Sequence, residues 1–235
     1  MFAILKKEFK FYFYSPIAYI LIGLFVALVS IFFFGSNINS QSADLSQVLS
    51  TIGFILSFII PILTMRILSE DRKTGTEVLY ITSPVSLVKM VLGKYLAMVL
   101  VFIVMICFTI VYPIIIFVFA KPAIAPLITS YIGLILLGAT FISIGVFVSS
   151  LTENQIISAV ISLVCLIFIQ LIEMLRGMVG GNLSNVLHWF SLMARYNDFT
   201  SGQLSIASIV YYLSFIAVFI FLTIRVIEKR RWSQG

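Results

Sequence analysis

Charged and hydroxyl side chains gather in one short part of this chain, residues 69–86, with the sequence SEDRKTGTEVLYITSPVS. Acids, bases, a glycine and hydroxyl residues fill its first half, and long apolar runs lie on both sides of it. The composition of residues 76–81 allows a short helix, and Pro84 would stop this helix from continuing. Charges followed by exposed apolar residues are typical of a docking element for a partner protein. The apolar residues are Val78, Leu79 and Ile81.

A plain solvated loop is the alternative interpretation of residues 69–86. Connections between helices usually need only about two to eight residues, whereas the polar connection around this segment is much longer. The segment also places Gly75 and Pro84 where turns need them. Its length and its turn residues therefore favour the docking element.

The rest of the sequence offers no set of residues typical of catalysis or metal binding. His188 is the only histidine, and no Cys, Asp or Glu lies at ligand spacing from it, so we expect an ordinary interfacial histidine. Asp198 and Arg195 indicate a loop contact rather than a catalytic pair. The only Gly-Lys pair, Gly93-Lys94, lacks the first glycine of a P-loop. The sequence therefore predicts no catalytic residues, no metal site and no ATP hydrolysis by this chain.

The composition shows the environment in which the polar segment lies. The chain has 235 residues, of which 61% are hydrophobic and 10% charged, and its mean hydropathy is +1.17. Soluble domains carry about 25% charged residues, and a soluble protein of this size could not bury so much apolar surface. The solvent for most of the chain is therefore lipid. Cys107 and Cys165 lie inside apolar runs and are expected to be small hydrophobic residues.

Six apolar runs reach the length of about 20 residues that a membrane-spanning helix needs. Strand-type alternation is absent, which argues against a barrel. We therefore expect an all-α membrane protein with six transmembrane helices. The outer loop 176–205 is long enough for a short re-entrant or interfacial helix, with Trp189 and Phe190 at the interface. The six runs are 17–34, 48–68, 95–119, 126–149, 156–175 and 206–227.

Basic residues predict the orientation, because Lys and Arg gather on the cytoplasmic side of a membrane protein. Most of the 15 Lys and Arg residues lie in the N-terminal segment, the loop after the second run and the C-terminal end. Only Lys121, Arg176 and Arg195 fall on the opposite side. We expect a protein of the cell (inner) membrane with both termini on its cytoplasmic side. The net charge of +6 then needs no nucleic acid to explain it.

The first residues, 1–15, differ from a span, because they combine lysines with aromatic residues. Apolar and aromatic side chains fall on one helical face, and lysines fall largely on the other. This pattern predicts an interfacial helix along the inner leaflet with aromatic anchors at headgroup depth; a disordered charged tip is the alternative. The apolar face holds Leu5, Phe9, Tyr12 and Phe13, and the polar face holds Lys6, Lys7 and Lys10.

Residues 69–97, SEDRKTGTEVLYITSPVSLVKMVLGKYLA, resemble the first cytoplasmic loop of ABC-2 type transporter permeases. A second stretch, SIGVFVSSLTENQIISAVIS at residues 143–162, is also similar and indicates the gliding-motility and copper-maturation branch. The resemblance extends over nearly the whole chain, so residues 1–235 are expected to form a single permease domain. The positions that match in the first stretch are Glu70, Arg72, Gly75, Thr76, Glu77, Leu79, Thr82, Ser83, Pro84, Val85, Ser86, Gly93 and Lys94.

The resemblance implies a transport subunit that forms a dimer with an identical or related permease chain. It also implies a separate ATPase subunit, present in two copies, that holds ATP and Mg²⁺ and docks on a coupling helix in residues 69–88. This chain would bind no cofactor itself. Charged residues would contact the ATPase or fix the loop, and apolar residues would fill its cleft. The candidate coupling residues are Glu70, Arg72, Gly75, Thr76, Glu77, Val78, Leu79, Ile81, Thr82, Ser83 and Pro84.

Small residues in the fourth run predict close helix packing, since short side chains let helices approach in lipid. The candidates for this packing are Gly138, Gly145 and Ser149. Pro61 and Pro113 are expected to weaken their helices and permit kinks. No acidic residue lies at a bilayer midplane, which argues against proton coupling. A transport pathway is therefore expected to be apolar or to lie at a dimer interface.

Three functions compete at this point. The first is the membrane half of an ATP-driven exporter, and the resemblance favours it. The second is a membrane-embedded enzyme, which would need a polar constellation within the spans that the sequence lacks. The third is a non-transporting anchor or assembly subunit of an ATP-driven envelope or motility machine. The same coupling loop would serve the first and the third, and the substrate stays open.

Overall fold

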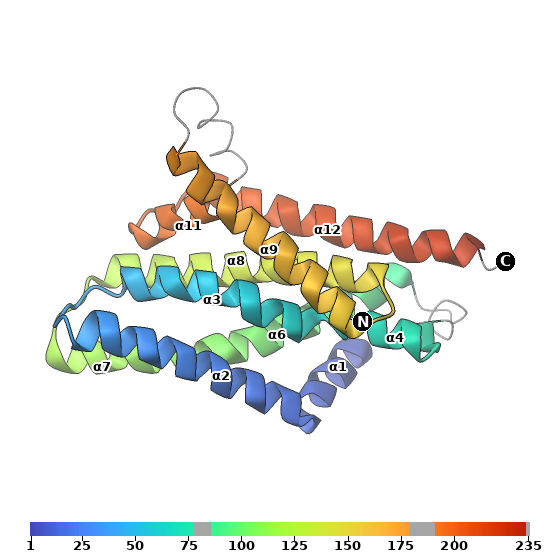
Figure 1. The fold of residues 1–235 in the computed structure, drawn as a ribbon, viewed down its shortest axis with the longest axis horizontal. Helices are drawn as coiled ribbons and strands as arrows, with labels where there is room; N and C mark the ends of the chain where they lie inside the picture. The colour runs from blue at the N-terminus through green and yellow to red at the C-terminus, as the bar shows by residue number, and fades with distance from the viewer. Residues whose placement is uncertain (78–85, 179–190, 234–235) are drawn as a thin grey trace.

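The computed structural model of the chain describes residues 1–77, 86–178 and 191–233 (Figure 1). Within these ranges the regular structure is helical and contains no strand. The helices in chain order are α1 (Phe2–Tyr14), α2 (Pro16–Phe33), the π-helical turn η1 (Phe34–Ile38), α3 (Ser46–Thr64), α4 (Ser69–Lys73), α6 (Leu87–Thr109), α7 (Val111–Phe119), α8 (Ile124–Leu151), α9 (Gln155–Met178), α11 (Leu192–Thr200) and α12 (Ile206–Ser233).

Six helical stretches within the described ranges are long and apolar enough to cross a membrane, which confirms the predicted all-α fold with six spans. The third stretch begins at Leu87, ahead of the start expected at residue 95, so Lys94 lies inside it. The stretches are Pro16–Ile38, Ser46–Lys73, Leu87–Phe119, Ile124–Leu151, Gln155–Met174 and Ile206–Arg230.

Helix α8 is the centre of the bundle and contacts α3, α6, α9, α11 and α12. Its most apolar stretch is 78% buried inside the protein, against 17% for that of α9. The close approach of α6 and α3 to α8 depends on one glycine each. A Cβ atom at Gly138 would collide with the Phe102 ring of α6, and one at Gly145 would collide with Thr64 of α3. Both glycines therefore lie where neighbouring helices come nearest to α8.

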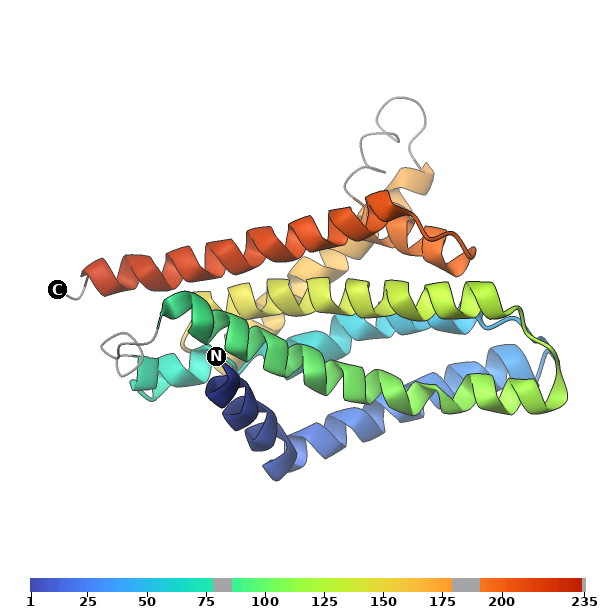
Figure 2. The ribbon, with the colours of Figure 1, turned by 180° about the vertical axis from the view of Figure 1, so that it is seen from behind.

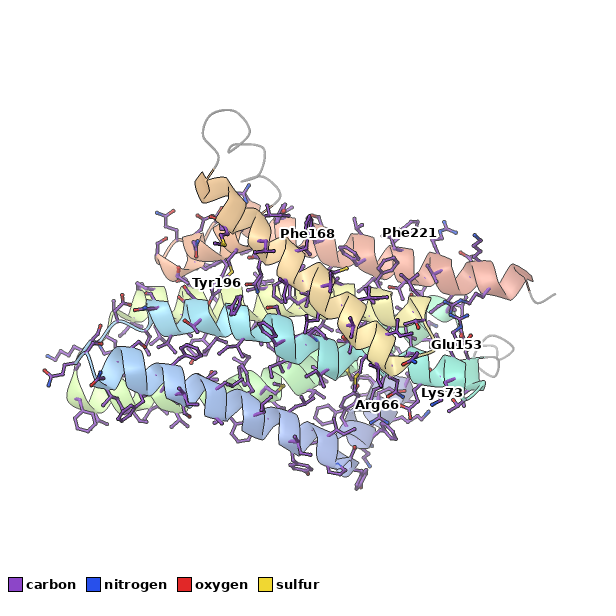
Figure 3. The ribbon with its side chains drawn as sticks, in the orientation of Figure 1. Arg66, Lys73, Glu153, Phe168, Tyr196 and Phe221 are labelled. Carbon is purple, nitrogen blue, oxygen red and sulfur yellow. The ribbon has the colours of Figure 1, made fainter. Side chains whose placement is uncertain are left out.

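The outer helices expose large apolar side chains. Phe168 of α9 and Phe221 of α12 are both more than half exposed and project from the bundle (Figure 3). Lipid tails solvate such side chains in a protein that crosses the bilayer. These two helices therefore present a largely exposed apolar surface on the outside of the bundle.

Both chain termini lie at one end of the bundle, together with α1 and α4, as Figures 1 and 2 show. We call this the terminal end. The opposite end, which holds η1, α7, α11 and the start of α8, is the distal end. That the terminal end faces the cytoplasm stays a prediction.

A break separates α6 from α7. Pro113 has no N–H group, and its ring clashes with the carbonyl group four residues earlier, that of Thr109. The Thr109 carbonyl instead accepts a hydrogen bond of 3.1 Å from the hydroxyl group of Tyr131 on α8. Pro61, in contrast, lies inside α3 without interrupting it. Only Pro113 of these two prolines coincides with a break.

Helix α1 packs against α6 and α2. Lys6 and Lys10 are exposed, as the helical spacing predicts. Tyr12 differs from the headgroup anchor expected above, because its side chain is 1% exposed and belongs to the core. The amphipathic pattern identified the apolar face of α1, but it could not show that part of this face meets protein instead of lipid. That α1 lies along a membrane interface stays a prediction.

Helix α11 lies in the loop for which a short helix was expected, whereas Trp189 and Phe190 fall outside the described residues. It packs against α8 and α3. Tyr196 of α11 is fully buried and donates a hydrogen bond of 3.0 Å to the Leu49 carbonyl of α3. This bond joins the short helix to the bundle core.

Candidate functional site

The α-helix is interrupted where α3 ends and α4 begins. Residues 65–68 form this interruption, which we call the elbow. Ends of helices leave backbone N–H and carbonyl groups without partners inside the helix, and buried groups of this kind need partners elsewhere. The elbow is largely buried, so its backbone must be satisfied by other elements of the protein.

Side chains from α1 and α6 satisfy two carbonyl groups at the elbow. The Tyr12 hydroxyl group of α1 donates a hydrogen bond of 2.6 Å to the carbonyl of Leu63, in the last turn of α3. The Lys94 ammonium group of α6 donates a bond of 2.9 Å to the carbonyl of Ile67. Burial raises the pKa of Tyr12 well above its ordinary value, although Arg66 opposes the shift. The phenol therefore stays protonated and can donate.

Ser149 of α8 satisfies the other side of the elbow. Its Oγ atom accepts hydrogen bonds from the backbone N–H groups of Leu68 (3.2 Å) and Ser69 (3.1 Å). The same hydroxyl group donates to the carbonyl of Met65 at 3.0 Å. One serine thus uses its single donor and both of its acceptor positions. A residue expected to serve close packing also fixes the start of α4.

Lys94 is the centre of a buried charge cluster with Glu8 of α1 and Asp71 of α4. Its Nζ atom lies 2.9 Å from Glu8 Oε1 and 2.8 Å from Asp71 Oδ2. The lysine side chain is 1% exposed, and the two carboxylates are 10% and 17% exposed. Such charge-assisted bonds are short and strong. The three residues, which we call the Lys94 cluster, join α1, α4 and α6.

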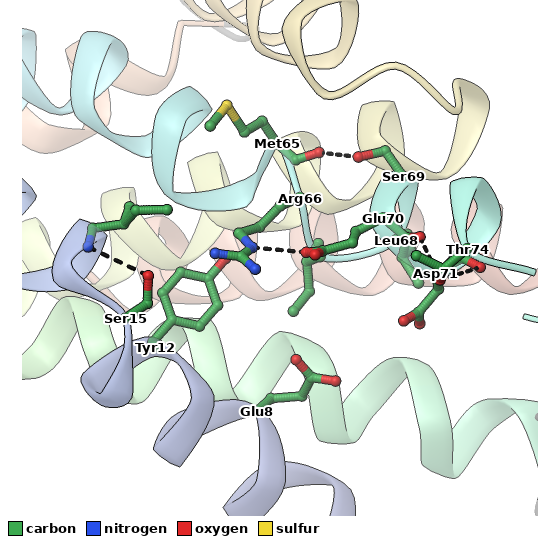
Figure 4. A network of polar contacts seen from close by, with 12 residues as sticks. Glu8, Tyr12, Ser15, Met65, Arg66, Leu68, Ser69, Glu70, Asp71 and Thr74 are labelled. Carbon is green, nitrogen blue, oxygen red and sulfur yellow. Dashed lines mark hydrogen bonds and ion pairs between the residues drawn. The ribbon is translucent and has the colours of Figure 1, made fainter. Parts of the chain in front are cut away.

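A second ion pair lies beside the cluster. Arg66 of the elbow binds Glu70 of α4, with 2.8 Å between Nε and Oε2 (Figure 4). The Arg66 guanidinium group also lies 4.4 Å from the centre of the Phe11 ring of α1, a cation–π distance. These side chains and those of the Lys94 cluster line one pocket of about 170 Å³. Glu70, a predicted coupling residue, is therefore paired within the chain.

Two arginines hold the C-terminal end of α8. Arg72 of α4 donates to the Leu151 carbonyl at 3.1 Å and pairs with Glu153 at 2.8 Å. Arg230 of α12 donates to the Ser150 carbonyl. Cations are stabilised at this end of a helix by the helix dipole. We call the two arginines and their partners the α8 clamp.

Glu77 belongs to the same clamp. Its carboxylate lies 3.2 Å from the Arg230 guanidinium group, and both side chains are largely buried. The pair joins the chain that follows α4 to α12. The predicted coupling residues Glu70, Arg72 and Glu77 therefore all have ionic partners within this chain, which is the arrangement expected if they fix the loop. Contact with another protein stays a prediction for them.

The remaining candidate coupling residues divide into two groups. Gly75 has a positive φ of 72°, which glycine adopts without strain, and it follows the end of α4. The Thr76 hydroxyl group donates to the Asp71 carboxylate at 3.2 Å. Six candidates lie outside the described residues, namely Val78, Leu79, Ile81, Thr82, Ser83 and Pro84.

The sequence did not reveal the Lys94 cluster. Lys94 was assigned to a loop because the third span was expected to begin after it. The signal was available, since Lys94 is the only charged residue between Met90 and Thr109. Its acidic partners are distant in the sequence, and no helical spacing relates them.

At the distal end, Asp198 accepts a hydrogen bond from the Ser208 hydroxyl group at 3.2 Å, and the Arg195 guanidinium group lies over the Tyr211 ring.

The spans and the elbow define a multi-pass membrane protein in which a short polar helix is built onto several spans. Residues 36–227 match the family model described as ABC-2 family transporter protein. This match covers most of the chain, and the chain belongs to the ABC-2 family of transporter proteins. The resemblance noted in the sequence is thereby confirmed for the family, while the branch stays a prediction. The comparison with curated proteins found no significant match.

Proposed function

We propose that the chain is the permease subunit of an ATP-driven exporter, with a separate ABC ATPase that docks on residues 69–88. The ATPase, in two copies, would hold ATP and Mg²⁺, and a second permease chain would complete the transporter. The chain would lie in the cell membrane, with both termini on the cytoplasmic side. Family membership supports a transport subunit. Export as the direction of transport follows from the family resemblance.

The construction of the elbow carries the proposal. A docking element can drive a permease only if it moves the spans when it is displaced. Helix α4 is joined to α1 and α6 through Lys94, to α8 through Ser149 and Arg72, and residue Glu77 joins α12 through Arg230. A force on residues 69–77 would therefore reach four other helices directly.

The charge distribution supports the predicted orientation. Exposed basic residues cluster at the terminal end, on α1 and on the last turns of α12, including Lys6, Lys10, Arg225 and Lys229. Lys and Arg are enriched on the cytoplasmic side of membrane proteins, which is where an ATPase has access to ATP. Helices α1 and α4 and the C-terminal part of α12 share one end of the bundle (Figure 1).

Co-purification from membranes tests the proposal. Residues 78–85 are replaced by a Gly/Ser linker of equal length, which keeps Asp71, Arg72 and Glu77. We expect an ATP-binding protein to purify with the intact chain and to be lost with the linker variant. Lys121→Ala, at the distal end, is the control and should retain the partner. If the intact chain brings down no ATP-binding protein, or the linker variant retains it fully, docking on this segment is wrong.

A further inference from the structure

Lys94 joins three elements that are separate in the sequence. Its ammonium group binds Glu8 of α1, Asp71 of α4 and the Ile67 carbonyl of the elbow, all at 2.8–2.9 Å. Glu8 and the Ile67 carbonyl accept hydrogen bonds from the ammonium group, and Asp71 forms an ion pair with it. Helix α6, which carries Lys94, is itself held close to the central helix through Gly138. Lys94 thus relates α1 and α4 to the bundle core.

Stability alone does not explain a charged residue at this position. The loss of hydration offsets much of the attraction within a buried ion pair, and apolar residues of similar volume often give an equal or higher stability. Buried ion pairs do fix geometry, because their charge-assisted bonds are short and directional. A Lys94 cluster is therefore suited to setting the position of α1 relative to α4.

We propose that Lys94 is a positioning residue that makes α1 move together with α4. The proposal rests on the proposed function, in which the ATPase displaces residues 69–77. The first helix is then a driven part of the transporter instead of a passive membrane anchor. A displacement of α4 pulls Asp71 and the elbow, and through Lys94 it carries Glu8 and the whole of α1.

A purely structural role of the Lys94 cluster predicts a different behaviour of α1 from transmission of movement. One variant distinguishes these two roles. In the triple variant Glu8→Gln, Asp71→Asn, Lys94→Met, no charge of the cluster remains buried without its partner. If the ion pairs only balance buried charges, α1 moves in the triple variant as it does in the intact chain. If they transmit movement, the triple variant folds and binds the ATPase, but α1 no longer follows α4.

A distance measurement on the complex tests transmission. Spin labels are placed at Lys6→Cys on α1 and at Gln203→Cys at the distal end, both exposed positions, after Cys107 and Cys165 are changed to Ala. In the complex with its ATPase, ATP and vanadate should shift the distance between the labels. We expect the triple variant to lose this shift while it keeps the ATPase bound. An equal shift in the triple variant would overturn the proposal.

Hydrogen exchange on the permease alone provides a second measurement that does not depend on the ATPase. Glu8→Gln on α1 should accelerate exchange of the amides of α4 by about tenfold, because the loss of one partner loosens the cluster. Lys10→Gln, an exposed position on the same helix, is the matched control. Unchanged exchange in α4 would show that α1 does not position it. A missing ATPase, in contrast, would overturn only the proposed function.

Discussion

The two ends of this bundle are held together in different ways. At the terminal end, buried or partly buried charges join α1, α4, α6, α8 and α12 through the Lys94 cluster and the α8 clamp. At the distal end, the contacts described above between elements include neutral hydrogen bonds, such as that from Tyr131 to Thr109, together with the bond from Ser208 to Asp198 and the contact of Arg195 with the Tyr211 ring. Pockets of about 430 and 470 Å³ also open there, beside α3, α8 and α11 and between η1 and α7.

This difference indicates how movement is distributed in the molecule. Charge-assisted bonds are about twice as strong as neutral ones, so the terminal end is expected to move as one unit. Neutral contacts and open volume at the distal end leave room for helices to rearrange.

The largest expected contrast concerns two lysines. Lys94→Met leaves Glu8 and Asp71 buried without their cation and should lower the free energy of unfolding by about 3–5 kcal/mol. Lys121 at the distal end is exposed, and Lys121→Met should change the free energy of unfolding by less than about 0.5 kcal/mol. Unfolding by SDS in mixed micelles, followed by circular dichroism, measures both. Equal stability of the two variants would remove the contrast between the ends.

Two serines of α8 give the next contrast. Ser149→Ala leaves the backbone N–H groups of Leu68 and Ser69 without the acceptor they have in the intact chain and should cost about 2–3 kcal/mol. Ser130→Ala removes only a bond to the Pro126 carbonyl within the same helix, so about 0.5 kcal/mol is expected. Exchange of the Ser69 amide hydrogen should also accelerate in the first variant. A slow Ser69 amide in Ser149→Ala would show that another group can replace the hydroxyl.

Two tyrosines provide a smaller contrast, because both donate to a backbone carbonyl group. Tyr12→Phe should cost about 1–2 kcal/mol, since the Leu63 carbonyl at the buried end of α3 loses its donor. Tyr131→Phe should cost about 0.5–1 kcal/mol, because Tyr131 is only partly buried. The same SDS titration measures both. A larger loss for Tyr131→Phe would contradict the ranking of the two ends.

The smallest effects concern two residues with positive φ. Gly75→Ala, beyond α4, should cost about 1 kcal/mol because alanine is strained at a φ of 72°. Gln41 at the distal end has a φ of 52°, and Gln41→Gly should stabilise the protein by about 0.5 kcal/mol by relieving its backbone. Thermal unfolding in nanodiscs should show shifts of opposite sign. Shifts of the same sign would mean that backbone strain does not determine the effect of these substitutions on stability.

The spans could be predicted from the sequence because lipid imposes a simple rule. Each backbone polar group within the bilayer must be paired, so a long apolar run becomes a helix of about 20 residues or more. All six predicted runs correspond to helices of the structure. The start of the third span was misplaced because Lys94 was treated as a loop residue. A lysine with two carboxylate partners can lie near the start of a membrane-spanning helix, and the local sequence does not show those partners.

The site was predicted only in part, for a related reason. The charges and turn residues of residues 69–86 identified the segment, because they are neighbours in the sequence. The contacts of Tyr12, Lys94 and Ser149 with the elbow join residues that are far apart, and each contact depends on the direction in which its helix packs. Helical periodicity gives the face of a helix and not the group that the face meets.

The position of the Lys94 cluster in the chain has a consequence for biosynthesis. The cluster residues Glu8, Asp71 and Lys94 all lie within or before the first three spans, as do Tyr12 and Leu63. A growing chain is inserted from its N-terminus, and early segments can fold before later ones are made. The ionic contacts of Lys94 with α1 and α4 can therefore form before the ribosome has reached α8. Ser149 and Arg230 then complete a terminal end whose first half has already been assembled in the membrane.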